Sequence, residues 1–310
     1  MKCRFPIADG LYFMAPAPIA LFTYNRPAHT QRTVRALQRC ALAKESQLHV
    51  YSDGPRNVKA EPAVREVRDF LKTVDGFAVV HVHERETNIG LAESVIDGVT
   101  HLCSEFGSVI AVEDDLVVAP GFLAYLNAAL ERYRDDPQVM QIAGHMFPVD
   151  VPTTDDAFFL PFISSWGWAT WDRAWHKFDP HAAGYSLLKN DENRRRAFDM
   201  NGCFDYFSML EAQLAGKIDS WAIRWNLSVF MNNGMVLYPG KSLVENIGFD
   251  GSGVHCRSEA PDQIMDPDFF PDHLPEPGIV QATQNQVFQY FRSRRSPGAR
   301  WRALMQRVFR

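Results

Sequence analysis

The sequence predicts an α/β fold, in which a mostly parallel, Rossmann-like sheet is flanked by helices. In the first half of the chain, short apolar runs alternate with helical patterns of about 10–15 residues, which is typical of β-α-β units. Polar residues directly follow several of these runs. Of the 310 residues, 46% are apolar and 22% are charged, which excludes a disordered or collagen-like chain.

The elements of the first half follow one another closely. Pro18–Tyr24 is predicted as a buried strand because its residues are almost all apolar, and Arg26-Pro27 opens the next segment. A second strand is stopped by Asp53-Gly54-Pro55, which is a strong turn signal. The expected segments are strands at 18–24, 48–52, 77–83 and 108–112, and helices at 30–42, 61–73 and 92–106.

The second half is less periodic. We expect strands at 138–144 and 235–238, and helices at 204–213 and 220–232. Beyond Pro261, the density of Pro and Asp predicts an extended segment, followed by a basic amphipathic helix.

A tryptophan-rich segment stands out at 164–175. Trp168, Trp171 and Trp175 have the i, i+3, i+7 spacing of a helix stripe that faces the core, so we expect them mainly to pack. Trp rings also stack on the apolar faces of sugars. Trp166, on the preceding loop, is the better candidate for lining a sugar site.

Charge and cysteine content narrow the function classes. The formal net charge of −5 argues against a general nucleic-acid binder. The five cysteines show no CxxC spacing, so neither a disulfide framework nor a zinc site is indicated, and a reducing, cytoplasmic compartment suits them. No apolar run approaches the length of a membrane span.

Three polar groups each follow a predicted strand: Asn25-Arg26, Asp53 and Glu113-Asp114-Asp115. The carboxyl ends of parallel strands share one edge of a sheet, where ligands collect, so these groups are expected to converge. Three consecutive carboxylates after a buried strand repel one another and are costly to desolvate. A divalent cation such as Mg²⁺ or Mn²⁺ would compensate them. The alternative is a solvated acidic turn.

The segment VEDDLVVAPGFLAY at 112–125 resembles the metal-binding segment of N-acetylglucosaminyltransferase I, a GT-A fold inverting glycosyltransferase. PIALFTYNRP at 18–27 and Tyr51-Ser52-Asp53 are similar to the same family. WGWATWDRAW, NNG at 232–234 and NIGFDGSGVH at 246–255 resemble bacterial family-2-type glycosyltransferases. The resemblance implies a GT-A domain over 1–260, with a nucleotide-binding half (18–130), an acceptor-side C-terminal half (131–260), and an extended, basic tail (261–310).

The resemblance also implies roles for individual residues. Asp115 would be the direct metal ligand, and His255, after a glycine-rich loop, would be the second. For a single histidine, the alternative is a purely structural role. The nucleotide-sugar would be contacted by Thr23, Asn25, Arg26, Asp53, Asn88, Glu113, Asp114 and Trp166.

An inverting transferase needs a general base for the acceptor hydroxyl. The family places it in an Asp-Asp-Trp segment, and this chain has Asp219-Ser220-Trp221 in the comparable place, so one acid is missing. We favour Asp219 as the base, and Asp205 and Asp172 are the next candidates. The alternative is that Asp219 caps the helix that begins near Ser220.

The expected activity is metal-dependent, inverting transfer of a sugar, such as a hexose or N-acetylhexosamine, from a UDP-linked donor. The acceptor would be a hydroxyl of a glycan or lipid-linked molecule, such as a growing bacterial surface polysaccharide. A sugar nucleotidyltransferase is an alternative, but such enzymes have a glycine-rich loop after the first strand, where this chain has Asn25-Arg26-Pro27. A non-catalytic binding module is a second alternative, and the retained carboxylates count against it.

Seven arginines and no acids lie between Tyr290 and Arg310. This tail could bind anionic lipid at the inner face of a membrane, since apolar side chains are interspersed with the arginines. A solvated terminus is the alternative.

Overall fold

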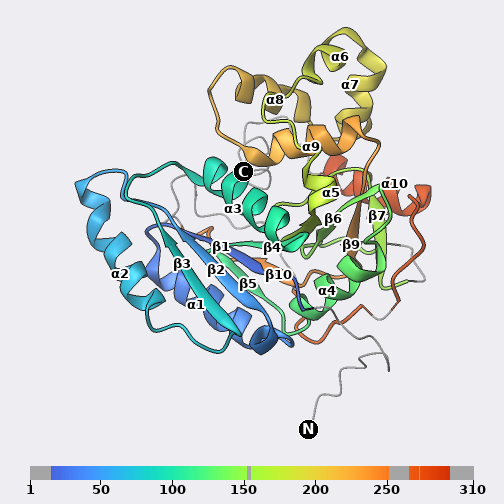
Figure 1. The fold of residues 1–310 in the computed structure, drawn as a ribbon. Coiled ribbons are helices and arrows are strands. Elements are labelled where there is room, and N and C mark those ends of the chain that lie inside the picture. The colour runs from blue at the N-terminus through green and yellow to red at the C-terminus, as the bar shows by residue number, and fades with distance from the viewer. Residues whose placement is uncertain (1–14, 152–154, 251–264, 272, 294–310) are drawn as a thin grey trace.

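An eight-stranded sheet runs through the centre of the protein (Figure 1). The structure is a computed structural model that describes residues 15–151, 155–250, 265–271 and 273–293. The strands of the large sheet are β1 (Ile19–Thr23), β2 (Gln47–Ser52), β3 (Val79–Glu84), β4 (Ser108–Glu113), β6 (Val139–Ala143), β7 (Ala157–Leu160), β8 (Trp168–Trp171) and β9 (Met235–Pro239). Their order across the sheet is β3-β2-β1-β4-β8-β6-β9-β7.

Most neighbouring strands of this sheet are parallel. β1 pairs in parallel with β2 and β4, β2 with β3, and β6 with β9. β8 is antiparallel to both β4 and β6, so those two strands point the same way. The carboxyl ends of β1, β2, β4 and β6 therefore share one edge. The α/β class with a mainly parallel sheet is confirmed.

Helices cover both faces of the sheet. α1 and α4 lie on one face, whereas α3, α5 and α9 lie on the other, and α6, α7 and α8 form a lobe above α9 (Figure 1). Their bounds are α1 (Pro27–Gln38), α2 (Glu61–Leu71), α3 (Leu91–Phe106), α4 (Phe122–Arg132), α5 (Asp172–Trp175), α6 (Tyr185–Asn190), α7 (Glu192–Phe198), α8 (Tyr206–Leu214), α9 (Trp221–Met231) and α10 (Gln281–Ser293). Short 3-10 turns occupy Ala43–Glu45, Val58–Ala60 and Met200–Gly202.

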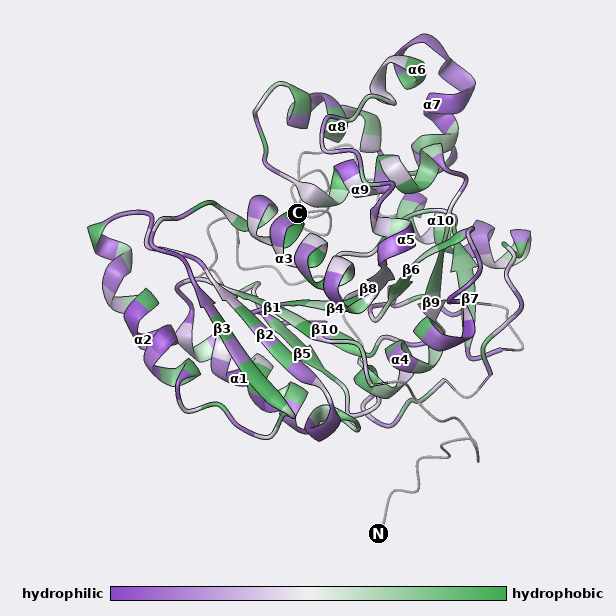
Figure 2. Ribbon diagram, viewed as in Figure 1, coloured by the Kyte–Doolittle hydropathy of each residue, from purple (hydrophilic) through white to green (hydrophobic). Residues whose placement is uncertain are grey.

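The central strands are apolar at nearly every position because helices cover both of their faces. All five residues of β1 are buried, and so are the middle four of β4. At the edge of the sheet, by contrast, every residue of β3 is exposed or partly exposed. Figure 2 shows the same contrast, with apolar central strands and largely hydrophilic outer helices such as α7.

The tryptophan-rich segment differs from the expectation. The predicted helix stripe is wrong, because Trp168–Trp171 forms β8 and only the last four residues of the segment form α5. Residues three apart on a strand point to opposite faces of the sheet, and the rings of Trp168 and Trp171 do so. Trp168 stacks on Trp221 with ring centroids 4.9 Å apart, whereas Trp171 Nε1 donates to the Leu130 carbonyl at 3.0 Å. These side chains are buried, as the packing interpretation requires.

The last described helix packs against the body of the protein. Val287, Phe288 and Phe291 of α10 are buried, and the Phe291 ring lies 4.7 Å from that of Phe147. Residues 294–310 of the arginine-rich tail lie outside the described residues. Across the parts of the chain that the structure describes, no helix is both long and apolar enough to cross a bilayer.

Four histidines gather where β2 and β3 meet α3. The His49 ring lies 4.6 Å from that of His81, and its Nδ1 is 3.2 Å from His83 Nε2. His101 of α3 approaches the same group and bonds Tyr51 through its Nδ1 at 2.8 Å. Burial, reinforced by the neighbouring imidazoles, lowers the pKa of His49 to about 4.

We predict that the free energy of unfolding falls as the pH drops from 6.5 towards 4. The unfolded chain binds a proton at His49 near pH 6.5, whereas the folded protein resists it until about pH 4, so protonation favours unfolding. The contribution of neutral His49 to stability is fully present above pH 6.5, and the part of the loss that comes from His49 is on the order of 2–3 kcal/mol. Urea unfolding at pH 7.5 and 4.5 measures it. If His49→Gln has the same pH dependence as the natural chain, this origin is wrong.

Candidate active site

The acidic triplet lies at the carboxyl end of β4, where the chain turns into β5 (Leu116–Val118). β5 pairs antiparallel with β10 (Val244–Asn246). Because β1 and β4 are parallel neighbours, Arg26, just beyond β1, reaches this turn. Its Nη2 bonds Asp114 Oδ1, and its Nη1 lies 3.0 Å from Asp115 Oδ2. The backbone N–H of Tyr24 also donates to Asp114 Oδ2 at 3.3 Å. The predicted convergence of Arg26 with the acidic triplet is observed.

The charges in this cluster are strongly perturbed. Burial alone would lower the pKa of Arg26, but Asp114 and Asp115 outweigh it and raise that pKa above its ordinary value, so the guanidinium stays charged. Burial raises the pKa of Asp114, while Arg26 opposes the rise. The single guanidinium thus holds two adjacent carboxylates together in a place with little water.

One carboxylate oxygen of Asp115 makes no hydrogen bond to the described part of the chain. Its Oδ2 is engaged by Arg26, but its Oδ1 is buried and has no hydrogen-bond partner in the described part of the chain. The segment after β10 closes over this carboxylate, because the Ile247 N–H donates to the Asp115 carbonyl at 2.8 Å. A side chain at Gly248 would collide with Asp115 Oδ2, so glycine is needed for this close approach.

Asp53, at the end of β2, organises the loop before α3. Its carboxylate accepts hydrogen bonds from Asn88 Nδ2 at 2.7 Å, from the Ile89 N–H at 3.1 Å and from the Gly90 N–H at 3.0 Å. Gly90 has a φ of +85°, a conformation that favours glycine. Asp53 and Asn88, both predicted as nucleotide contacts, therefore lie together at the same edge.

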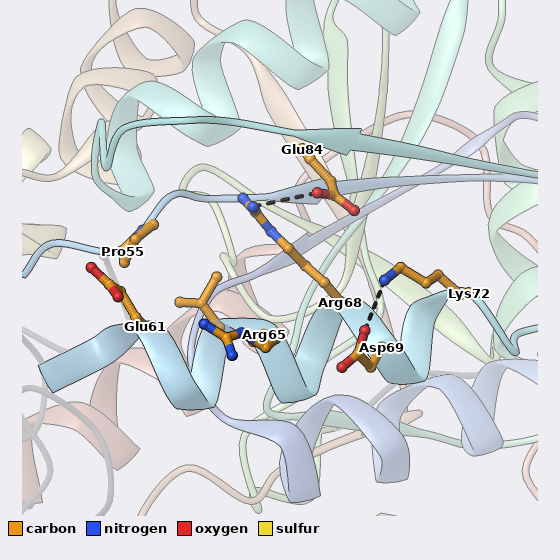
Figure 3. A pocket seen from close by; sticks show the side chains of 8 residues that line it. Pro55, Glu61, Arg65, Arg68, Asp69, Lys72 and Glu84 are labelled. Carbon is orange, nitrogen blue, oxygen red and sulfur yellow. Dashed lines mark hydrogen bonds and ion pairs between the residues drawn. The ribbon is translucent and has the colours of Figure 1, made fainter. Parts of the chain in front are cut away.

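A cavity of about 360 Å³ lies beside α2, and Arg68 extends across it (Figure 3). The Arg68 guanidinium pairs with Glu84 at 3.3 Å and donates to the carbonyl oxygens of Arg85 at 2.6 Å and of Ser52 and Asp53, each at 3.4 Å. It therefore ties the ends of β2 and β3 together beneath Asp53. Sequence reasoning missed Arg68, because an arginine on a charged helix gives no distinct signal.

The candidate bases lie in different places. Asp219 Oδ2 is 3.8 Å from the point that a Cβ on Gly90 would occupy, and Asp219 pairs with Arg224 at 3.4 Å, so it lies beside the Asp53 loop. Ser220 caps α9, since its hydroxyl accepts from the Ile223 N–H. The alternative, that Asp219 is this cap, is wrong.

The contacts of Asp205 and Asp172 indicate structural roles for both residues. Asp205 caps α8 by accepting from the Ser208 N–H at 3.2 Å, within the helical lobe. The Asp172 N–H donates to the Gly107 carbonyl, just before β4 begins. The six-residue β4 is roughly 17 Å long, so the structure places Asp172 at the opposite edge of the sheet from Asp115.

Two further side chains with unpartnered atoms lie at the carboxyl edge. Thr23 ends β1, and its hydroxyl is buried with no partner in the described residues. His145 lies two residues beyond β6, buried against Trp166 with ring centroids 4.5 Å apart. Sequence reasoning overlooked His145, although it directly follows the strand predicted at 138–144.

The fit to a metal rests on Asp115. His255 lies outside the described residues, and among the residues that are described no three His, Cys, Asp or Glu side chains are grouped to hold a metal ion. Mg²⁺ is usually held by one or two carboxylates together with substrate phosphates rather than by a full protein cage. A buried carboxylate oxygen without a partner fits this mode of binding.

No protein-family model matches the sequence, and no curated protein does. Similar solved structures include the mannosyltransferase PcManGT from Pyrobaculum calidifontis in complex with GDP-Man and Mn²⁺ (15% identity, 51% of this chain, TM-score 0.35). TarS from S. aureus is also similar, with 14% identity over 75% of this chain and a TM-score of 0.40. So is an active-site mutant of LgtC, with 10% identity over 56% of this chain and a TM-score of 0.34. The matches span 45%, 37% and 65% of those chains, less than two thirds of each.

We predict that Arg68→Leu lowers the free energy of unfolding by about 2 kcal/mol, because it leaves backbone carbonyls without their donor. Hydrogen exchange at the Ile89 and Gly90 amides should also quicken as the Asp53 loop loosens. Arg65→Leu is the matched control, since Arg65 lines the same cavity but is exposed. Urea unfolding and exchange measured by mass spectrometry test both variants. If both variants show the same free energy of unfolding and the same exchange rates, Arg68 does not hold the ends of β2 and β3 together.

Proposed function

We propose that the chain is a metal-dependent glycosyltransferase that moves a sugar from a nucleoside-diphosphate donor to a hydroxyl acceptor. The observation that carries this proposal is the buried Asp115 Oδ1, which has no partner in the described part of the chain and lies beside a permanently charged Arg26. It lies at the carboxyl edge of a mainly parallel sheet, where ligands of α/β proteins collect. The resemblance of 112–125 to the metal-binding segment of N-acetylglucosaminyltransferase I supports the same conclusion.

Arg26 and the two carboxylates that it pairs with, Asp114 and Asp115, would act together on the donor diphosphate. Asp115 would hold Mn²⁺ or Mg²⁺ through its Oδ1, and the bound ion would supply Lewis-acid stabilisation of the departing nucleoside diphosphate. Arg26 pairs with both carboxylates and would keep them oriented while the site is buried. The remaining proposed donor contacts are Thr23, Asn25, Asp53, Asn88, Glu113, Asp114 and Trp166, and the proposed second ligand is His255.

Asp219 is the proposed general base. Its side chain is 59% exposed, so it can reach an acceptor that arrives from solvent, and it lies beside the loop that Asp53 organises. It would take the proton of the acceptor hydroxyl as that oxygen bonds to the anomeric carbon from the face opposite the diphosphate. The bond from this carbon to the phosphate oxygen breaks, the nucleoside diphosphate leaves, and the anomeric configuration inverts.

The proposed donor is UDP-linked, carrying a hexose or N-acetylhexosamine, and the proposed acceptor is a glycan or lipid-linked hydroxyl. Release of nucleoside diphosphate from UDP-glucose, UDP-N-acetylglucosamine and GDP-mannose, with Mn²⁺ or with chelator, tests the proposal. Metal-dependent release supports it. A complete absence of release would indicate a binding module, and release of pyrophosphate from nucleoside triphosphates would indicate a nucleotidyltransferase.

We predict that Asp115→Asn reduces metal-dependent release of nucleoside diphosphate by about 10²-fold or more, because an amide is a much poorer ligand for a hard cation. Asp69→Asn is a matched control, since Asp69 is an exposed aspartate on α2 that pairs only with Lys72 among the described ion pairs. Circular dichroism confirms that both variants are folded. Unchanged turnover of Asp115→Asn would remove the metal from the mechanism.

We predict that Asp219→Asn lowers kcat for transfer by about 10²–10⁴-fold and leaves the Kd for donor unchanged, because the base acts on the acceptor. Asp205→Asn, which alters a helix cap in the lobe, is the control and should retain turnover. Titration calorimetry gives the Kd for donor, and steady-state kinetics give kcat. Full turnover of Asp219→Asn would assign the base elsewhere.

A further inference from the structure

His145 is a buried polar side chain to which the proposed mechanism gives no role. It follows β6, whose carboxyl end lies at the same edge as that of β4. Its ring contacts Trp166 and Phe147 edge-on, with ring centroids 4.5 and 5.0 Å away, and the residue is only 3% exposed. Within the described residues, its Nδ1 has no hydrogen-bond partner.

A buried nitrogen without a partner is a cost to the fold, and a ligand bound at the carboxyl edge of the sheet would remove that cost at His145. Burial lowers the pKa of His145 to about 3, so the ring is neutral at any physiological pH. A neutral imidazole offers one N–H donor and one acceptor nitrogen. This chemistry suits a hydroxyl group and does not suit a phosphate, which would favour a cation.

A chain of neighbouring residues links His145 to Asp115, the proposed metal ligand. Trp166, which contacts His145, lies 5.8 Å from the Phe249 ring. Phe249 directly follows Gly248, the residue that closes against Asp115 Oδ2. In a nucleotide-sugar the sugar is bonded directly to the diphosphate, so a donor whose diphosphate lies at Asp115 has its sugar close by. The row of rings formed by Phe249, Trp166 and His145 begins beside the same carboxylate.

We propose that His145 Nδ1 hydrogen-bonds a hydroxyl of the donor's sugar, while the Trp166 ring packs against the apolar face of the same sugar. The inference rests on the proposed function and deepens it, because it assigns one polar contact that recognises the sugar itself. Trp rings and neutral hydrogen-bonding groups together match the two kinds of surface that a pyranose presents.

His145→Phe tests the inference by thermal shift. Without ligand, its melting temperature should equal or exceed that of the natural chain, because an unpaired nitrogen is removed. UDP with Mn²⁺ should stabilise both proteins equally. The additional shift that UDP-glucose or UDP-N-acetylglucosamine gives over UDP should disappear in the variant, and the KM for donor should rise about tenfold or more.

Two further variants sharpen the test. His145→Asn can place a polar atom near the position of Nδ1 and should recover part of the sugar-dependent shift. His49→Phe removes another buried histidine, located where β2 pairs with β3, whose Nε2 also has no partner among the residues described. This variant should leave every ligand shift unchanged.

The outcomes separate the two proposals. If the natural chain gains a sugar-dependent shift and His145→Phe keeps it with an unchanged KM, the inference is wrong and the proposed function stands. If His145→Phe melts well below the natural chain without ligand, the nitrogen is already satisfied by the protein and the inference is also wrong. If the natural chain neither binds nor turns over any nucleotide-sugar, the proposed function itself fails.

Discussion

One guanidinium paired with two consecutive carboxylates is the constraint on which the rest of the site depends. Asp114 and Asp115 are nearly buried at the end of β4, and without Arg26 their charges would repel in a region with little water. Arg26 engages Asp114 and only one oxygen of Asp115. The other Asp115 oxygen remains buried and unpartnered among the described residues, and it is the atom proposed to bind the cation.

The surrounding structure serves to hold that arrangement in position. The parallel pairing of β1 with β4 brings Arg26 to the acidic turn, and the segment after β10 closes against Asp115 through Ile247 and Gly248. On the neighbouring strands, Arg68 fixes the ends of β2 and β3, and Asp53 fixes the loop that opens α3. The candidate site is thus held by contacts between side chains and backbone groups at strand ends, which ordinary sheet geometry places together.

Sequence reasoning located this edge because it needs only two facts, the alternation of strands with helices and the polar residues that follow each strand. It failed where the pattern fits two structures or gives no signal. Trp168 and Trp171 have helical spacing yet lie on a strand, because packing against α9 and α4 decided their conformation. Arg68 and His145 act through contacts between segments far apart in the chain, which composition and spacing do not encode. Strands of three residues, such as β5 and β10, are too short to show a period.

The most direct test of this account is a crystal structure of the protein with UDP and Mn²⁺, with the ion located by its anomalous scattering. The account predicts manganese bonded to Asp115 Oδ1 and to both phosphates of UDP, with Arg26 still paired to Asp114. Manganese bound away from Asp115, with that carboxylate oxygen still unpartnered beside bound UDP, would contradict it.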